Sequence, residues 1–165
     1  MAVVNIHSRE LPATAGEVGA LIDSLAGDGD RLWPQDRWPP MRFDRPLGVG
    51  AVGGHGPVRY TVEEYQPGLW IRFRFSGPRG FDGFHEFTVH RGGNGSAELR
   101  HLLAIHARGP ARLTWPLIFR RMHDACLEDC LDRAERAVTG TVRGPARWSP
   151  VVRVLRAVIE RFGTR

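Results

Sequence analysis

The chain has 165 residues, of which 42% are hydrophobic and 25% are charged. This is the size and composition of one globular domain with an apolar core. No segment approaches the roughly 18 consecutive apolar residues that a membrane-spanning helix needs. Residues 1–5 also lack the basic stretch and apolar block of a secretory signal. We therefore expect a soluble, cytoplasmic protein.

Charge is unevenly distributed along the chain. All 23 basic residues are arginine, and the net charge is +5. Residues 1–139 contain 17 arginines and 17 acidic residues, whereas residues 140–165 contain six arginines and a single acid, Glu160. The sequence thus predicts a neutral body and a basic extension, and any electrostatic partner would bind the extension. The lack of lysine, and of aromatic residues interleaved with the arginines, argues against nucleic-acid binding.

The first 40 residues predict a strand, a helix and a loop. Residues 3–8 are rich in β-forming types, and residues 13–25 place apolar side chains three and four positions apart, as on one face of a helix. Glycines at 27–29 end that helix. The segment 32–40 is dense in tryptophan and proline, which excludes a regular helix or a central strand and indicates an ordered loop.

The middle of the chain predicts an antiparallel sheet. From residue 41 to residue 107, β-prone runs alternate with glycine- and proline-rich turns. In the run 69–75, hydrophobic residues alternate with Arg72 and Arg74, which predicts one buried and one exposed face. The short connections imply hairpins rather than parallel crossovers. The expected strands cover residues 41–46, 49–54, 57–66, 69–76, 83–91 and 96–107.

The last third predicts one long helix and one short helix. After Pro110 the hydrophobic period becomes helical and continues to about Val138. Two cysteines four residues apart on this helix are expected to be reduced and unbonded. The predicted apolar side carries Trp115, Phe119, Met122, Cys126, Cys130 and Ala137, and the predicted solvent side carries Asp124, Glu128, Asp132 and Glu135. An amphipathic helix is expected at 150–162.

This order of elements resembles the helix-grip superfamily of START lipid-transfer domains, birch-pollen-allergen-like proteins and polyketide cyclases. Two short motifs add to the resemblance: the strand start Gly48-Val49-Gly50-Ala51 and the turn Tyr65-Gln66-Pro67-Gly68. The resemblance implies an α+β fold in which a curved antiparallel sheet of about seven strands surrounds a long C-terminal helix, in the order β-α-α-β6-α. Residues 1–139 would form the ligand-binding domain, and 140–165 a basic amphipathic extension. The resemblance implies an apolar cavity but no particular reaction.

The alternation along the strands predicts which polar residues face this cavity. His85 and His101 should both point inward, opposite one another if the hairpin is centred on Gly93, or diagonal after a one-step shift. His123 should lie toward the apolar side of the long helix, and Tyr60 should share an inward face with Glu64. The predicted ligand-binding residues are Tyr60, Glu64, Phe73, His85, His101, Leu103, Trp115, Phe119, Met122 and His123.

Two functions follow for these residues. The favoured one is binding of a lipid, an isoprenoid or an aromatic polyketide, with the histidines orienting the ligand. The alternative is a cyclase or dehydratase in which His85 and His101 act as general acid and base. His85, His101 and His123 could also hold a divalent metal ion, but we expect no metal and no cofactor. His123, Cys126 and Cys130 do not have the spacing of a structural zinc site, and a fourth ligand is missing.

The tryptophan-rich loop and the terminal helix complete the predictions. Trp33, Trp38 and Met41 are expected either to form the mouth of the cavity or to anchor the loop to the core. The helix at 150–162 is expected to pack on its own domain or on a second subunit, as in a homodimer. Weak contact with an anionic membrane surface is the alternative for this helix.

Overall fold

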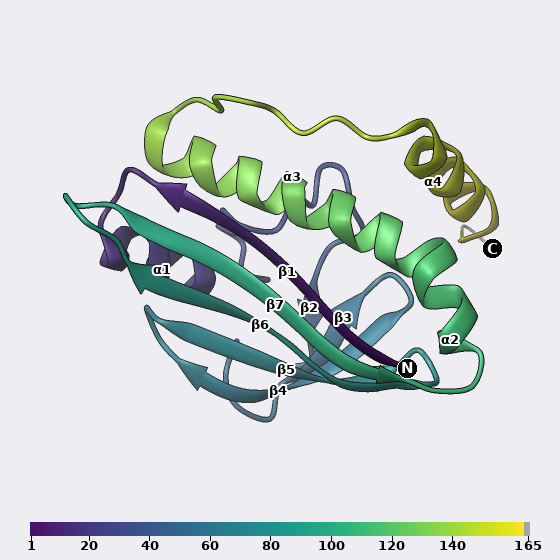
Figure 1. The fold of residues 1–165 in the computed structure, drawn as a ribbon. Helices are drawn as coiled ribbons and strands as arrows, with labels where there is room; N and C mark the ends of the chain where they lie inside the picture. Colours follow the sequence, from purple (N-terminus) through teal and green to yellow (C-terminus); the bar gives the residue numbers. More distant parts are fainter. Residues whose placement is uncertain (164–165) are drawn as a thin grey trace.

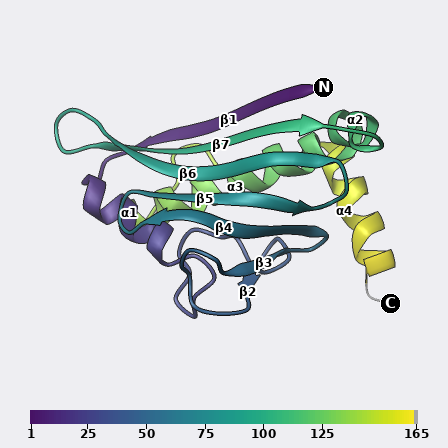
Figure 2. The same cartoon turned by 90° about the horizontal axis from the view of Figure 1, so that it is seen from below.

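The computed structural model describes residues 1–163, apart from the side chains of Glu160 and Phe162. One antiparallel sheet contains seven strands in the order β1-β7-β6-β5-β4-β3-β2. The long helix lies across one face of this sheet, alongside β1 (Figures 1 and 2). The strands are β1 (Ala2–Leu11), β2 (Arg42–Phe43), β3 (Val52–His55), β4 (Val58–Gln66), β5 (Trp70–Gly77), β6 (Phe81–Arg91) and β7 (Ala97–Ala107).

The helices follow the predicted order with one exception. They are α1 (Ala15–Asp23), α2 (Ala111–Thr114), the π-helical turn η1 (Trp115–Phe119), α3 (Arg120–Thr139) and α4 (Pro150–Gly163). The predicted α+β architecture is confirmed, but the second helix expected before β2 is absent, since residues 24–41 form turns. The carboxylate of Asp30 binds the backbone N–H groups of Ala26, Leu32 and Trp33, and the prolines that follow cannot supply helical hydrogen bonds.

Helix α1 is fixed at both ends by side-chain hydrogen bonds. Thr14 and Glu17 form a reciprocal capping box at its start. At its end, Asp23 accepts hydrogen bonds from the Tyr65 hydroxyl and from the backbone N–H of Gly68. A Cβ atom on Gly19 would lie 1.9 Å from the Gly68 carbonyl oxygen, so only glycine allows this approach. The turn between β4 and β5 is thereby docked on α1.

The predicted long helix is continuous from Ala111 to Thr139 but changes its winding. Residues 115–119 form a π-helical turn that includes Pro116. Proline has no N–H to donate to the preceding turn, which explains why the α-helical pattern is interrupted here. The turn places Trp115 in the core with Phe81, Leu103 and Ile105.

The predicted solvent side of this helix is wrong at two positions. Asp132 and Glu135 are buried because Arg9 of β1 donates to both, at 2.6 Å and 3.0 Å. Sequence periodicity could not show that an inward-pointing arginine of the first strand lies against the acidic side of the helix. Ala137, predicted to be buried, is exposed instead.

The segment after Gly140 folds back along α3. Its backbone N–H groups at Arg143 and Ala146 donate to Glu135 and Asp132. The apolar side expected for α4 is largely exposed, at Val151 (44%), Val154 (63%), Val158 (48%) and Ile159 (41%), which corrects the expectation that this side is packed on the domain. Of the described side chains of α4, the buried one is Val152, which lies outside that predicted side. None of the helices in the described residues combines the length and apolar character needed to cross a membrane.

Candidate functional site

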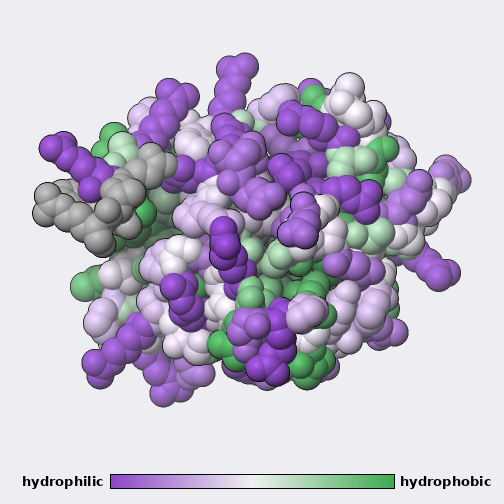
Figure 3. Space-filling model, turned by 180° about the vertical axis from the view of Figure 1, so that it is seen from behind, coloured by the Kyte–Doolittle hydropathy of each residue, from purple (hydrophilic) through white to green (hydrophobic). Residues whose placement is uncertain are grey.

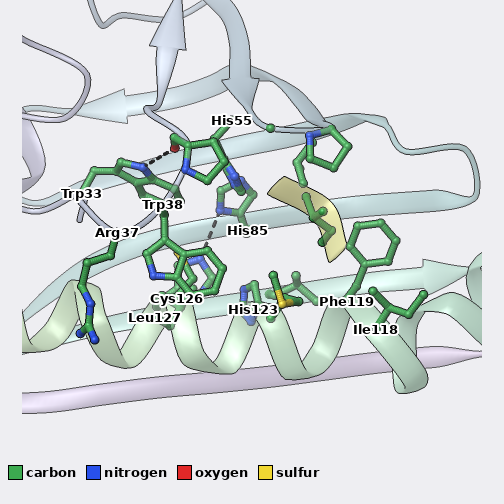
Figure 4. A pocket seen from close by; sticks show the side chains of 18 of the residues that line it. Trp33, Arg37, Trp38, His55, His85, Ile118, Phe119, His123, Cys126 and Leu127 are labelled. Carbon is green, nitrogen blue, oxygen red and sulfur yellow. Dashed lines mark hydrogen bonds between the residues drawn. The ribbon is translucent and has the colours of Figure 1, made fainter. Parts of the chain in front are cut away.

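A cavity of about 450 Å³ lies between the sheet and the long helix. Its wall is formed by strands β5–β7, the helical segment from Trp115 to Leu127 and the loop before β2, with further residues from the β3–β4 hairpin and from α4 (Figure 4). The sheet contributes Phe75, Phe81, His85, Phe87, His101 and Leu103, and the helical segment contributes Trp115, Ile118, Phe119, Met122, His123, Cys126 and Leu127. The sheet and helix parts of the wall are therefore mainly aromatic and aliphatic, with imidazoles as their polar groups. The loop and α4 add Gln35, Asp36, Arg37 and Arg156.

Seven of the ten predicted ligand-binding residues line this cavity. They are His85, His101, Leu103, Trp115, Phe119, Met122 and His123. Tyr60 and Phe73 point inward but are fully buried behind His85, with ring centroids 4.9 Å from its imidazole. They pack behind residues of the wall and do not line the cavity themselves.

The inward orientation predicted for Glu64 is wrong. A β-bulge in β4 inserts one residue between Val62, which pairs with Phe73, and Glu64, which pairs with the outward-facing Arg72. The extra residue reverses the alternation, so the Glu64 side chain is exposed and lies 3.7 Å from the Arg72 guanidinium. Glu64 was the only acidic residue among those predicted to face the cavity, so none of the remaining predicted residues is acidic.

The two histidines of the β6–β7 hairpin are diagonal neighbours. His101 pairs with Phe87, and His85 pairs with Leu103, one step from the directly opposite arrangement. The turn is centred on Asn94 rather than on Gly93, because the Gly92 N–H bonds the Ser96 carbonyl and Asn94 adopts a left-handed conformation. The imidazoles still meet, with His85 Nδ1 and His101 Nε2 3.2 Å apart.

Both imidazoles are neutral at physiological pH. Burial lowers the pKa of His85 and of His101 well below the usual value, and the neighbouring His123 adds to the effect. One nitrogen of each neutral ring is therefore protonated, and the bond between the rings uses one N–H and one lone pair. Whichever ring donates, the pair retains one N–H donor and one lone-pair acceptor, on His85 Nε2 and His101 Nδ1. Neither atom has a hydrogen-bond partner among the described residues.

The row of imidazoles continues beyond this pair. The His123 ring centroid is 5.1 Å from that of His101 and 5.9 Å from that of His7 on β1. His7 lies against Asp124 and Glu128 of α3. Burial alone would lower its pKa, but the hydrogen bonds to these carboxylates outweigh burial and raise the pKa to about 9. Sequence analysis did not find His7, because the only signal was its inward parity in the first strand.

His55 is a second cavity residue that sequence analysis missed. It ends the short strand β3, where the glycine-rich sequence indicated only a turn. Its ring centroid lies 4.5 Å from that of Trp33, and desolvation lowers its pKa to about 3. Together with His85, His101 and His123, a fourth imidazole therefore borders the cavity, on the side of the loop (Figure 4).

The comparisons with known proteins agree on the architecture. No family model matches the chain, and no curated protein matches it. Solved structures do. Norcoclaurine synthase from Thalictrum flavum has a TM-score of 0.65 at 16% identity, covering 84% of this chain and 87% of that one. CalU16 from Micromonospora echinospora has a TM-score of 0.59 at 16% identity over 99% and 88% of the two chains, and Ara h 8.0201 has 0.60 at 12% over 86% and 100%.

The chain has the helix-grip fold. The neighbours include enzyme-like and allergen-like proteins, and no branch of the helix-grip superfamily is singled out. Identities of this size establish the architecture, so the cavity of this helix-grip protein has to be interpreted from its own residues.

The loop at the mouth of the helix-grip cavity is anchored by one buried carboxylate. Asp129 of α3 accepts hydrogen bonds from the indole N–H groups of Trp38 and Trp148 and from the Arg37 guanidinium, at 2.6–2.8 Å. Trp33 and Trp38 both line the cavity. Met41 is buried in the core and does not line the cavity, which corrects its predicted place at the mouth.

Helix α4 closes one side of this mouth. Arg156 lies over the rings of Trp38 and Trp148 and donates to the carbonyl oxygen of Arg37. Arg156 and Ile159 both line the cavity. Figure 3 shows the face behind the view of Figure 1, where apolar residues form small groups between hydrophilic ones. The segment beyond residue 140 thus completes a site that the first 139 residues begin.

Proposed function

We propose that this protein binds a flat, apolar small molecule that carries a hydroxyl or carbonyl group. An aromatic polyketide, an isoprenoid or a similar lipid belongs to this class. The observation that carries the proposal is the cavity of about 450 Å³, apolar in its walls, with a neutral His85–His101 pair in its lining.

The size and composition of the cavity suit a small organic ligand. Ligand pockets in proteins commonly measure about 300–1,000 Å³ and combine apolar walls with a few polar groups that fix orientation. The aromatic rings of Phe75, Phe87 and Phe119 line this cavity and offer flat surfaces. Transfer of an apolar ligand from water onto these surfaces supplies the driving force for binding.

The histidine pair suits one polar group on that ligand. A hydroxyl both donates and accepts, and the His85–His101 pair holds one donor and one acceptor without partners. A carbonyl would use the donor alone. Because the imidazoles are neutral, a bound anion gains no ion pair from them, and we expect uncharged ligands to bind better.

A structural neighbour supports this ligand class. One structure of norcoclaurine synthase from Thalictrum flavum, with a TM-score of 0.65 and 13% identity, is a complex with dopamine and hydroxybenzaldehyde. Both compounds pair an aromatic ring with hydroxyl groups. We further propose that residues 1–139 form the ligand-binding domain and that the basic extension serves as part of its mouth.

Equilibrium dialysis with 2-naphthol and 2-methoxynaphthalene tests the proposal. Only 2-naphthol can both donate and accept, so we expect it to bind about 5- to 10-fold more tightly, the equivalent of about 1 kcal/mol for one hydrogen bond. Met122→Trp, which fills the cavity, should weaken both ligands at least 10-fold. Leu113→Trp, on the exposed side of the same long helix, is the matched control and should change neither affinity. Equal loss in both variants, or no binding by the unaltered protein, would refute the proposal.

The neutral imidazoles favour an acid–base enzyme as the second candidate. His85 and His101 could remove a proton from carbon next to a bound carbonyl group and return it elsewhere, as cyclisation or dehydration requires. The test is deuterium exchange into the methyl group of 2-acetonaphthone, followed by NMR. His101→Gln should abolish any exchange that the protein catalyses while leaving affinity within a few-fold. Exchange that persists in this variant contradicts the enzymatic role.

The exposed apolar side of α4 supports a third candidate, weak contact with an anionic membrane surface. Residues 140–165 carry six arginines and one acid, and Val154 and Val158 of α4 are open to solvent. Basic amphipathic helices bind such surfaces through both features. A second copy of the chain is the other surface that could cover these residues.

A further inference from the structure

We propose that His7, His123 and Asp124 form a binding site for a divalent transition-metal ion of the Zn²⁺ class, between β1 and α3. His123 and Asp124 are adjacent on α3, whereas His7 lies on β1, and the sequence did not single out this combination. One potential ligand atom from each lies within 4.8 Å of the other two.

The spacing of these atoms is close to that of a coordinated set. His7 Nε2 is 3.1 Å from Asp124 Oδ1, and His123 Nδ1 is 3.9 Å from the same oxygen. Ligands about 2.0–2.2 Å from a Zn²⁺ ion are themselves separated by little more than 3 Å, so small side-chain rotations suffice. The ion would take the place of the proton that now lies between His7 and Asp124.

The surrounding residues already hold two of these ligands in the required orientation. His7 Nδ1 lies 2.8 Å from Glu128 Oε1, which leaves Nε2 toward Asp124 and gives the carboxylate–histidine–metal arrangement of protein metal sites. Asn5 donates to Asp124 Oδ1 at 2.9 Å and fixes that carboxylate.

The second, independent observation is the state of His123. Both of its ring nitrogens are buried, and neither has a hydrogen-bond partner among residues 1–163. Buried nitrogens without partners are uncommon, and a bound ion is one of their recognised causes. An ion held by Asp124 and His7 would satisfy one of these nitrogens.

The donor set selects the class of metal. Two imidazole nitrogens and one carboxylate oxygen suit Zn²⁺, Co²⁺ or Ni²⁺, whereas Mg²⁺ and Ca²⁺ prefer oxygen ligands throughout. Three protein ligands leave at least one position for water or a ligand atom. Of the three residues, His123 also lines the cavity, so the ion would lie in the wall between the cavity and β1. It would also fasten the first strand to the long helix.

The experiment is a calorimetric titration of the full-length, tag-free protein with Zn²⁺, followed by the absorption spectrum of the Co²⁺ form. We expect one ion per chain and a thermal midpoint that rises with Zn²⁺ concentration. His7→Gln, His123→Gln and Asp124→Asn should each lose nearly all affinity, and Glu128→Gln should lose about 10- to 100-fold. His106→Gln, at an exposed histidine of β7, is the matched control and should bind normally.

Three results would overturn the proposal. The first is no Zn²⁺ binding by the unaltered protein, which would leave His7 as an ion-paired cation only. The second is binding that His7→Gln and Asp124→Asn leave undiminished, and the third is binding lost in His85→Gln but kept in His7→Gln. The Co²⁺ spectrum of the unaltered protein reports the coordinating atoms directly, so the proposal stays testable if one variant fails to fold.

Discussion

Replacing the buried histidine pair with apolar residues should stabilise the protein while weakening its binding of hydroxylated ligands. The double variant His85→Phe/His101→Leu keeps an aromatic ring stacked on Phe73 and Phe75, whose centroids lie 4.9 Å from that of His85. It removes His85 Nε2 and His101 Nδ1, which are buried without partners, and it removes the hydrogen bond between the rings.

The magnitude follows from these contacts. Each buried nitrogen without a partner costs about 1–3 kcal/mol, and the lost hydrogen bond contributed about 1 kcal/mol. Because the two rings border a cavity, part of the cost of burying these nitrogens is already relieved in the unaltered protein. We therefore expect the free energy of unfolding to rise by about 1–3 kcal/mol in the double variant. For a chain of this length, the thermal midpoint should rise by about 2–12 °C.

Urea and thermal unfolding of the ligand-free proteins measure this effect. The preference for 2-naphthol over 2-methoxynaphthalene should disappear in the same variant. The control is His106→Leu, at an exposed histidine of β7, which should leave the midpoint unchanged. A double variant less stable than the unaltered protein would show that both nitrogens are satisfied in solution, and the argument for a ligand-binding pair would then fail.

Three further predictions concern pH, the loop anchor and the extension. The pKa of His55 is about 3 in the folded protein, below its ordinary 6.5, so the stability that is present above pH 6.5 is lost as pH falls. Between pH 7 and pH 5, urea unfolding should show that His55 alone lowers the free energy of unfolding by about 1–2 kcal/mol. A free energy of unfolding that does not change over this pH range contradicts the burial of His55. Asp129→Asn should lower the free energy of unfolding by about 2–3 kcal/mol, because Trp38, Trp148 and Arg37 all donate to this carboxylate; an unchanged urea midpoint would refute its anchoring role. If α4 contacts membranes, the intact protein should sediment with anionic vesicles and a protein lacking 141–165 should not; equal sedimentation refutes that contact.

The fold could be predicted from the sequence because its signals are local. Alternation of apolar and polar residues located β4 to β7, and a change to helical periodicity located the long helix. Short glycine-rich connections identified the hairpins. Each of these signals depends on a few neighbouring residues, which is why the order of elements was predicted well.

The site was predicted less completely because it depends on register and on contacts between distant elements. A single inserted residue in β4 turned Glu64 outward, and a hairpin turn centred one residue later made His85 and His101 diagonal. No local pattern signals either shift.

Contacts between the first strand and the long helix could not be predicted from the sequence either. Arg9 binds acidic residues of α3 that the helical periodicity placed on the solvent side. His7 contacts Asp124, which lies 117 residues further along the chain. Polar pairs of this kind form only when the sheet and helix pack, so they appear in the structure and not in the sequence pattern.

The most direct test of the central claim is to locate a bound ligand by NMR. In a saturated complex with 2-naphthol, we predict nuclear Overhauser effects from the ligand protons to the methyl groups of Leu103, Met122 and Leu127, which line the cavity. Effects confined to Val154 and Val158 on the exposed side of α4 would place the ligand on the surface, and would contradict the account of the cavity as the binding site.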